Sequence, residues 1–252
     1  MIWFKKFLQL LYSIYVITLF VACMLIAFLA VVVIIIVLPN TEKTNNLILR
    51  VCTLWARTWY AFIGIRHENI FEYPHDASQQ YVFVANHSSY MDIPPIVLAI
   101  TQPVRVLGKY EMIRYPIFGT IYKRAVVCVD RSSPERRAKS AKALQESVQK
   151  GLSIFLFPEG TFNESDQPLR AFYDGAFRIA IESQTPIKPL LLIDAEKRLH
   201  YSSLVAFTPG KNRVIFLETI PVAGLTMNDV PMLKALVYEK MEAGLRKYGV
   251  KK

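Results

Sequence analysis

The sequence predicts an α/β protein: a layered domain around a largely parallel central sheet, preceded by a helical segment that anchors the chain in a membrane. Two observations predict this class. Residues 7–38 contain no charged side chain and are rich in Leu, Ile, Val, Phe and Ala. After His75, short apolar runs alternate with helical patterns, an order typical of parallel sheets covered by helices.

The apolar run over residues 7–38 is long enough to hold the chain in a bilayer, because a membrane span needs about 20 apolar residues. As one straight helix, the run would be about 48 Å long at ~1.5 Å per residue. Two arrangements are open: one tilted span, or a helix that enters one leaflet and bends back. A cleaved signal peptide does not fit, because its apolar core has only about 7–15 residues.

Residues 44–65 predict a second, amphipathic helix, in which apolar and aromatic side chains recur three and four residues apart. Arg50 and Arg57 lie off this stripe. The stripe lies along the membrane interface or packs on the rest of the chain, and the sequence favours neither. We therefore expect a membrane anchor over residues 1–66 and an α/β domain over residues 67–252. The stripe consists of Leu47, Val51, Leu54, Trp55, Thr58 and Phe62.

The expected strands are six short apolar runs, at residues 81–85, 104–108, 125–130, 153–157, 187–193 and 213–218. Between the third and fourth runs, residues 134–150 predict a helix. Ser132 and Glu135 have the spacing of a capping box, and Pro134 suits a first helical turn. Residues 229–248 predict a final amphipathic helix, because their apolar side chains fall on one face.

The charge and the cysteines limit the possible partners. A net charge of +10 next to an apolar anchor indicates an anionic membrane surface rather than nucleic acid. Cys23, Cys52 and Cys128 form no CxxC pair and no metal-binding spacing, so we expect neither a metal site nor a disulfide framework.

The stretch NHSSYMD at residues 86–92 carries the first candidate site. In a straight helix, residues five apart point about 140° away from each other. Pro94 and Pro95 indicate that the regular helix begins near Asp92, so the preceding loop can fold His87 against Asp92. A carboxylate on one ring nitrogen leaves the other nitrogen free to accept a proton, as in a general base. Alternatively, the pair is a loop histidine beside a helix-capping aspartate and has no catalytic role.

The stretch LFPEGTFNES at residues 156–165 carries the second candidate site, because it too follows a predicted strand. Pro158 and Gly160 predict a tight turn that holds Glu159 at its apex. Backbone amides near such a turn can bind an anionic oxygen. Taken alone, this turn indicates no particular reaction.

Together, four motifs give a specific resemblance. They are NHSSYMD at residues 86–92, GKYEMIRYPIFG followed by VVCVDR within 108–131, FPEGT at 157–161 and TPIKPLLL at 185–192. Their order and spacing resemble the glycerophospholipid acyltransferases, the PlsC-type family that makes phosphatidic acid. The first and third motifs are the specific ones. The resemblance implies that the α/β domain has the glycerolipid-acyltransferase fold and is the catalytic domain.

The resemblance also implies roles for individual residues. His87 would be the general base, with Asp92 as its orienting partner. The acyl donor would be acyl-CoA or acyl carrier protein, and the acceptor would be 1-acyl-sn-glycerol-3-phosphate, with no metal or bound cofactor. Because acyl thioesters are cytosolic, we expect an enzyme of the inner (cytoplasmic) membrane whose catalytic domain faces the cytoplasm. The residues expected to bind the acceptor are Lys109 and Arg131, for its phosphate, and Glu159, Gly160 and Thr161, for its glycerol-phosphate part.

The chain departs from the family pattern at one position. The family often has Arg directly after FPEGT, and this chain has Phe162, which cannot pair with a phosphate. Three explanations are open. Lys109 and Arg131 suffice, or Arg170 or Arg178 reaches the phosphate, or the acceptor is another lyso-lipid, such as a lyso-aminolipid.

Two functions of other classes would need different residues from those of acyl transfer. A hydrolase would use Ser88 or Ser89 beside His87, but the chain has no GxSxG nucleophile elbow. A non-catalytic membrane adaptor on this fold would have no need of the His87 and Asp92 pair. The sequence therefore favours a membrane-bound acyltransferase.

Overall fold

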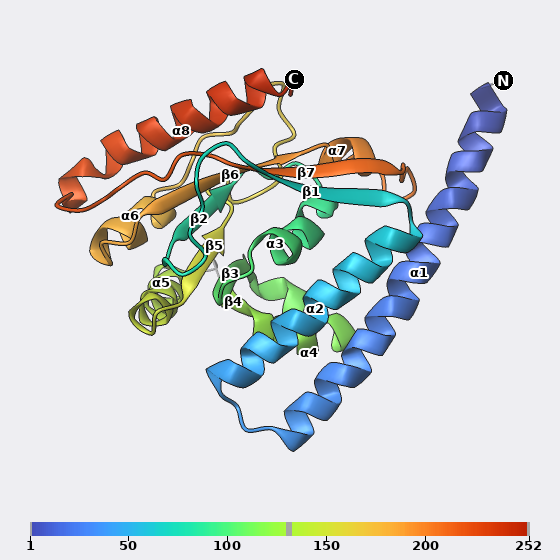
Figure 1. The fold of residues 1–252 in the computed structure, drawn as a ribbon, viewed down its shortest axis with the longest axis horizontal. Coiled ribbons are helices and arrows are strands. Elements are labelled where there is room, and N and C mark those ends of the chain that lie inside the picture. The colour runs from blue at the N-terminus through green and yellow to red at the C-terminus, as the bar shows by residue number, and fades with distance from the viewer. Residues whose placement is uncertain (1, 130–132, 251–252) are drawn as a thin grey trace.

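The computed structural model describes residues 2–129 and 133–250 and consists of an N-terminal helical hairpin beside an α/β domain (Figure 1). The hairpin is formed by α1 (Ile2–Val37) and α2 (Glu42–Phe62), which run antiparallel to each other. Helix α1 is continuous over residues 7–37 of the apolar run. The chain therefore turns back at the end of this run, at residues 38–41, and not in its middle.

Within the described residues, seven strands form one sheet in the order β1-β7-β6-β2-β5-β3-β4. All neighbouring strands are parallel except β6 and β7, which confirms the predicted, largely parallel sheet. The strands are β1 (Ile65–Phe71), β2 (Val82–Ala85), β3 (Val104–Lys109), β4 (Val126–Val129), β5 (Ser153–Leu156), β6 (Ile187–Ile193) and β7 (Gly210–Phe216).

Strand β1 was not predicted from the sequence, and it begins within the expected anchor segment. Polar residues occupy its middle, Arg66 to Asn69. It lies at the edge of the sheet and pairs only with β7 among the described strands. An edge strand buries little of its length, so it lacks the continuous apolar run that marks the central strands.

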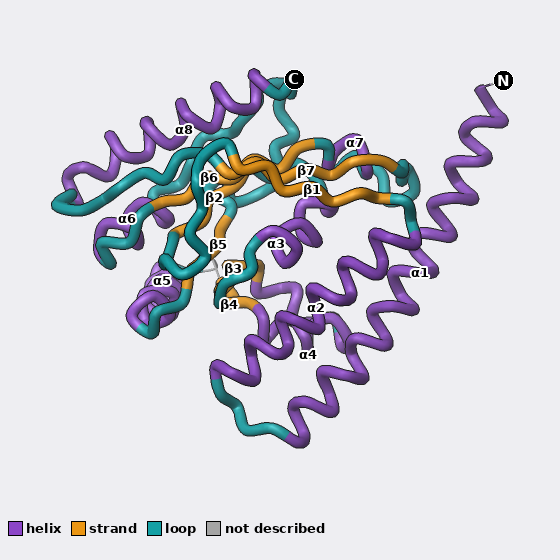
Figure 2. The backbone as a smooth tube through the Cα atoms, viewed as in Figure 1, coloured by secondary structure: helices purple, strands orange, loops and turns teal. Residues whose placement is uncertain are grey.

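Helices cover both faces of the sheet, and Figure 2 shows the strands between them. Helices α5, α6 and α8 pack on one face, and α3 packs on the other. Alternate side chains of β2 follow this division, since Val82 and Val84 face the first set whereas Phe83 and Ala85 face the second. The helices are α3 (Ile93–Ala99), α4 (Pro116–Ala125), α5 (Pro134–Gln149), α6 (Gly175–Glu182), α7 (Ala195–Arg198) and α8 (Val230–Lys247).

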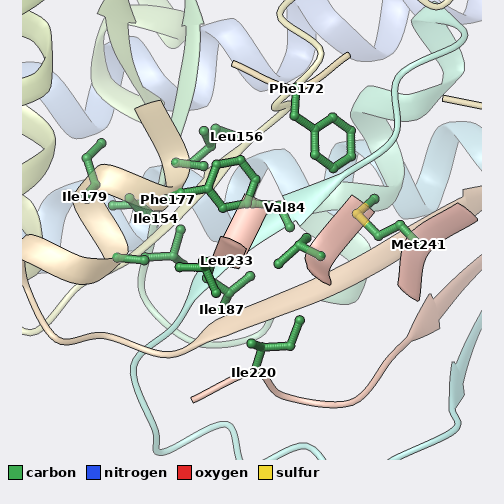
Figure 3. Packing of buried hydrophobic residues seen from close by; sticks show 14 of the residues in the cluster. Val84, Ile154, Leu156, Phe172, Phe177, Ile179, Ile187, Ile220, Leu233 and Met241 are labelled. Carbon is green, nitrogen blue, oxygen red and sulfur yellow. The ribbon is translucent and has the colours of Figure 1, made fainter. Parts of the chain in front are cut away.

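The main core lies between the sheet and helices α5, α6 and α8. Figure 3 shows Val84 of β2, Phe177 of α6 and Met241 of α8 in this cluster. Both predicted helices, over 134–150 and 229–248, are confirmed by α5 and α8. The predicted cap of α5 was one residue too early. Ser133 accepts the amide of Arg136 there, because Pro134 occupies the first helical position; Ser132 lies outside the described residues.

The α/β domain holds the hairpin near both ends of α1. Near its start, the side chains of Gln9 and Ser13 donate to carbonyls of Ala206 and Val205. At the other end, Arg105 of β3 forms an ion pair with Glu42, at the start of α2. Helix α1 contains Trp3–Val37, the one described helix that is long and apolar enough to cross a membrane. This apolar helix indicates that the protein associates with a membrane.

Helix α2 packs on the α/β domain, but not through the stripe that the sequence indicated. Leu54 and Phe62 of that stripe are 65% and 63% exposed. The buried face instead carries Ala56, Trp59 and Tyr60. This face contacts α1, α3 and β1, and it combines small and aromatic side chains that an apolar-stripe pattern does not single out. Leu47 of the predicted stripe is exposed as well, whereas Val51, Trp55 and Thr58 are half-buried.

Candidate active site

Three neighbouring strands bring the motifs to one edge of the sheet. Strand β5 lies between β2 and β3 and runs parallel to both, so the carboxyl ends of the three strands meet. His87 follows β2, the turn over residues 158–161 follows β5, and Lys109 ends β3. The sheet order therefore assembles side chains that lie far apart in the sequence.

The loop after β2 folds His87 against Asp92. Nδ1 of His87 lies 2.9 Å from Oδ2 of Asp92. The same oxygen accepts the backbone amides of Ser88, at 2.7 Å, and Ser89, at 2.8 Å. A short 3-10 turn, Tyr90–Asp92, closes this loop before α3 begins. The side chain of Asp92 is fully buried, and that of His87 is 15% exposed.

This contact defines what the histidine can do. An ionised carboxylate only accepts hydrogen bonds, so Nδ1 of His87 carries the hydrogen and Nε2 carries the lone pair. Nε2 makes no hydrogen bond to any described residue, and His87 faces a cavity. The arrangement can therefore take a proton from a group that enters the cavity.

Aromatic rings fix the imidazole of His87 from two sides. The ring of Phe157 stacks on it, with centroids 3.8 Å apart and planes 7° apart. Phe162 meets it edge-on at 4.4 Å, and Tyr90 meets Phe162 edge-on at 4.8 Å. Such packing holds the ring in one orientation and limits access of water to it.

Glu159 joins the two motif loops to each other. It is 1% exposed. Its Oε1 accepts the amide of His87 at 2.9 Å, and its Oε2 accepts the amide of Arg170 at 2.8 Å. The amide of Asn163 completes the junction by donating to the carbonyl of His87 at 2.7 Å. The motif predicts Glu159 at the apex of a turn, but the contacts of its buried carboxylate with backbone amides are not visible from the motif alone.

The turn itself depends on Gly160. Its φ of +72° lies in the left-handed region, which favours glycine because a side chain is strained there. Its amide donates to the carbonyl of Phe157 at 3.1 Å. Gly160 and the following Thr161 line the same cavity as His87.

This cavity has a volume of about 340 Å³ and mostly apolar walls. It extends from His87 and Phe162 to side chains of the hairpin, namely Ala27 of α1 and Cys52 of α2. Strand β3 and helix α4 supply further walls. No sequence pattern predicts this cavity, because its walls come from segments that only the fold brings together.

Comparison with known proteins identifies the family. A model of the acyltransferase family matches residues 65–193, a range that includes both motif loops. The chain belongs to the acyltransferase family. It is 29% identical over 219 residues to human 1-acyl-sn-glycerol-3-phosphate acyltransferase alpha, which covers 86% of this chain and 76% of the human protein. It is 30% identical over 184 residues to a chloroplastic 1-acyl-sn-glycerol-3-phosphate acyltransferase of Arabidopsis thaliana, covering 72% of this chain and 50% of that protein.

A solved structure shows the same fold over the full chain. The crystal structure of the 1-acyl-sn-glycerophosphate acyltransferase PlsC from Thermotoga maritima matches with a TM-score of 0.72 at 19% identity. The match covers 100% of this chain and 99% of that chain. The resemblance, the fold class and the enzyme class expected from the sequence are therefore confirmed.

The cationic residues expected at this acyltransferase site are only partly described. Lys109 is exposed and lines the cavity together with His87 and Thr161. Arg131 lies outside the described residues. Arg170 and Arg178 are both exposed, but only Arg170 contacts the FPEGT loop, through its amide to Glu159 and its guanidinium to the carbonyl of Phe162.

The two serines of the hydrolase alternative do not form a nucleophile–base pair here. The hydroxyl of Ser89 is buried and donates to the carbonyl of Leu199. Among the hydrogen bonds of the described residues, none joins the hydroxyl of Ser88 or Ser89 to the ring of His87. Nucleophilic catalysis by serine needs such a bond.

Proposed function

We propose that this acyltransferase transfers a fatty acyl group from acyl-CoA or acyl carrier protein to the free hydroxyl of 1-acyl-sn-glycerol-3-phosphate, forming phosphatidic acid. The observation that carries the proposal is the His87–Asp92 pair at one end of an apolar cavity. The names of the human and Arabidopsis relatives support the same acceptor. The substrate is therefore a lipid.

In this proposal the reaction is a direct transfer. Nε2 of His87 takes the proton of the acceptor hydroxyl while the hydroxyl oxygen bonds to the thioester carbonyl carbon. Asp92 stabilises the imidazolium that forms. The carbon–sulfur bond then breaks, and the leaving thiolate takes the proton from the imidazolium. No covalent enzyme intermediate and no metal or bound cofactor are needed.

The cavity is proposed to hold the hydrocarbon of a substrate. An apolar chain gains free energy by leaving water for a mostly apolar pocket. If the carbonyl end of a fatty acyl chain lies at His87, its hydrocarbon tail would extend toward Cys52 of α2 and Ala27 of α1. The hairpin would then both anchor the enzyme and form part of the binding site.

The acceptor's phosphate is proposed to lie at Lys109, which is exposed beside the cavity, and at Arg131, as the family pattern implies. Gly160 and Thr161, which line the cavity, would contact the glycerol-phosphate part. The carboxylate of Glu159 accepts backbone amides. Glu159 would therefore contribute to binding of the glycerol-phosphate part indirectly, by holding the loop in place.

The hairpin is proposed to keep the active site at the cytoplasmic surface of the inner membrane, with the catalytic domain in the cytoplasm. The acceptor and the product reside in the bilayer, whereas the thioester is soluble, so an interface gives access to both. The exposed apolar side chains of α1 and α2, including Ile26, Leu54 and Phe62, suit contact with lipid.

One observation keeps a second acceptor in consideration. Phe162 packs against His87 where the family often has Arg, so the site lacks one expected phosphate partner. A lyso-lipid with another headgroup, such as a lyso-aminolipid, would be acylated by the same chemistry. A non-catalytic adaptor is less well supported, because the buried pair of His87 and Asp92 serves no docking role.

The test is an acceptor panel analysed by mass spectrometry, with one labelled acyl-CoA and one labelled acyl carrier protein as donors. We expect label in phosphatidic acid when 1-acyl-sn-glycerol-3-phosphate is supplied. Label in another acylated lyso-lipid would support the second acceptor. Free fatty acid as the main product would support a hydrolase, and an unchanged thioester would support an adaptor.

A further inference from the structure

Position 162 cannot supply the cation that follows FPEGT in much of the family. The ring of Phe162 is held between the rings of His87, at 4.4 Å, and Tyr90, at 4.8 Å. It forms part of the apolar wall of the cavity. The FPEGT loop and the residue that follows it therefore offer the acceptor no cationic side chain of their own.

Arg170 is tied to this same loop by two hydrogen bonds. Its backbone amide donates to Oε2 of Glu159 at 2.8 Å, and Oε1 of that carboxylate accepts the amide of His87. Its guanidinium donates through Nη1 to the carbonyl of Phe162 at 3.4 Å. The guanidinium of Arg170 therefore lies beside Phe162, the position at which the family often has an arginine.

The guanidinium of Arg170 is available to an anion. It is exposed, and no carboxylate of the described residues lies within ion-pair distance of it. An arginine has five N–H donors in a planar fork that matches the oxygens of a phosphate. One contact to a carbonyl leaves most of these donors free.

We propose that Arg170 binds the phosphate of the acceptor and so takes the place of the arginine missing at position 162. The inference rests on the proposed function and adds a specificity-determining residue to it. Together with Lys109, which borders the cavity from β3, Arg170 places positive charge beside the cavity that holds His87. The acceptor's phosphate would lie there, outside the aromatic wall formed by Phe162.

The experiment measures steady-state kinetics of the full-length enzyme in mixed micelles, with 1-acyl-sn-glycerol-3-phosphate as the varied acceptor. Arg170→Gln should raise the KM for this acceptor about tenfold, as expected for one charge-assisted contact, and leave kcat within about twofold. Loss of a binding contact raises KM, whereas a disturbed loop lowers kcat. The effect of Arg170→Gln should shrink at high salt, because the contact is exposed.

Two further variants sharpen the test. Arg178→Gln removes another exposed arginine, which makes no hydrogen bond to the described residues of the FPEGT loop, and its KM should equal that of the wild type. Adding Phe162→Arg to Arg170→Gln should restore the low KM, because a cation returns to the loop. An unchanged KM in Arg170→Gln, or a fall in kcat alone, would overturn the inference. A wild-type enzyme that does not acylate this acceptor would instead overturn the proposed function and the inference with it.

Discussion

A single oxygen of Asp92 joins the imidazole of His87 to the turn on which both residues lie. Oδ2 of Asp92 accepts the ring hydrogen of His87 at 2.9 Å and also the amides of Ser88 and Ser89. The carboxylate therefore orients the base and closes the loop with the same atom. A substitution at this position should affect catalysis more than it affects the distant core.

The first prediction concerns Asp92→Asn. The amide side chain cannot accept three hydrogen bonds on one anionic oxygen, and its NH₂ group can hold His87 in the wrong tautomer. We expect kcat to fall about 10²–10⁴-fold. Asp166→Asn, at an exposed position, is the matched control and should keep wild-type turnover. Near-normal turnover in a folded Asp92→Asn enzyme would contradict the orienting role.

The second prediction concerns Glu159→Gln. Glutamine has one acceptor oxygen, so one of the two part-buried amides, of His87 or of Arg170, loses its partner. An unsatisfied buried group costs about 1–3 kcal/mol, which lowers the melting temperature by about 2–4 °C per kcal/mol in a domain of this size. Thermal unfolding measures this, with the exposed Glu164→Gln as control. Equal melting temperatures for the two variants would show that Glu159 does not hold the loops together.

The third prediction concerns the cavity. Cys52→Phe would fill space that the cavity now offers on α2, so the enzyme should favour shorter acyl thioesters than the wild type does. Competition between acyl-CoAs of different chain length, with products resolved by mass spectrometry, measures this preference. Cys23→Phe, on α1 but outside the cavity walls, should leave the preference unchanged. The same product distribution in the wild type, Cys52→Phe and Cys23→Phe would exclude the cavity as the site that binds the acyl chain.

The fourth prediction concerns removal of residues 1–64. Trp59, Tyr60 and Ile63 of this segment pack in one cluster with Met91, and the hydroxyl of Tyr60 donates to the carbonyl of Met91 at 3.4 Å. Met91 directly precedes Asp92. The shortened protein should therefore lose activity even on short, water-soluble acceptors, and it should aggregate more readily because apolar side chains become exposed.

The alternative for this segment is a role in membrane anchoring alone. In that case the shortened protein would stay soluble and would keep its activity on water-soluble acceptors. Tyr60→Phe in the full-length chain provides a milder variant, since it removes only the hydroxyl. It should remain on the membrane and show a reduced turnover, which separates support of the active site from anchoring.

The sequence predicted the central strands and the contact between His87 and Asp92 for physical reasons. Central strands of a parallel sheet are buried on both faces and so contain continuous apolar runs, such as residues 154–156 of β5 and 189–193 of β6. The prolines at 94 and 95 restrict the start of α3, and this restriction indicated a folded loop before it.

Other features depend on contacts between distant segments and could not be predicted. The cavity exists only because α1 and α2 pack beside β3 and α4. The roles of Glu159 and Tyr60 depend on which backbone groups the fold places next to them. Strand β1 carries a polar middle, so its pairing with β7 is set by the tertiary structure and not by its own pattern.

The most direct test of the account compares the wild type with His87→Ala, using a labelled acyl thioester and 1-acyl-sn-glycerol-3-phosphate. The wild type should place the label in phosphatidic acid. The variant should bind membranes and melt like the wild type, yet lose about 10²–10⁴-fold in rate, since no other described side chain replaces Nε2 of His87 as the base. Formation of phosphatidic acid at the wild-type rate by a folded His87→Ala enzyme would contradict the central claim.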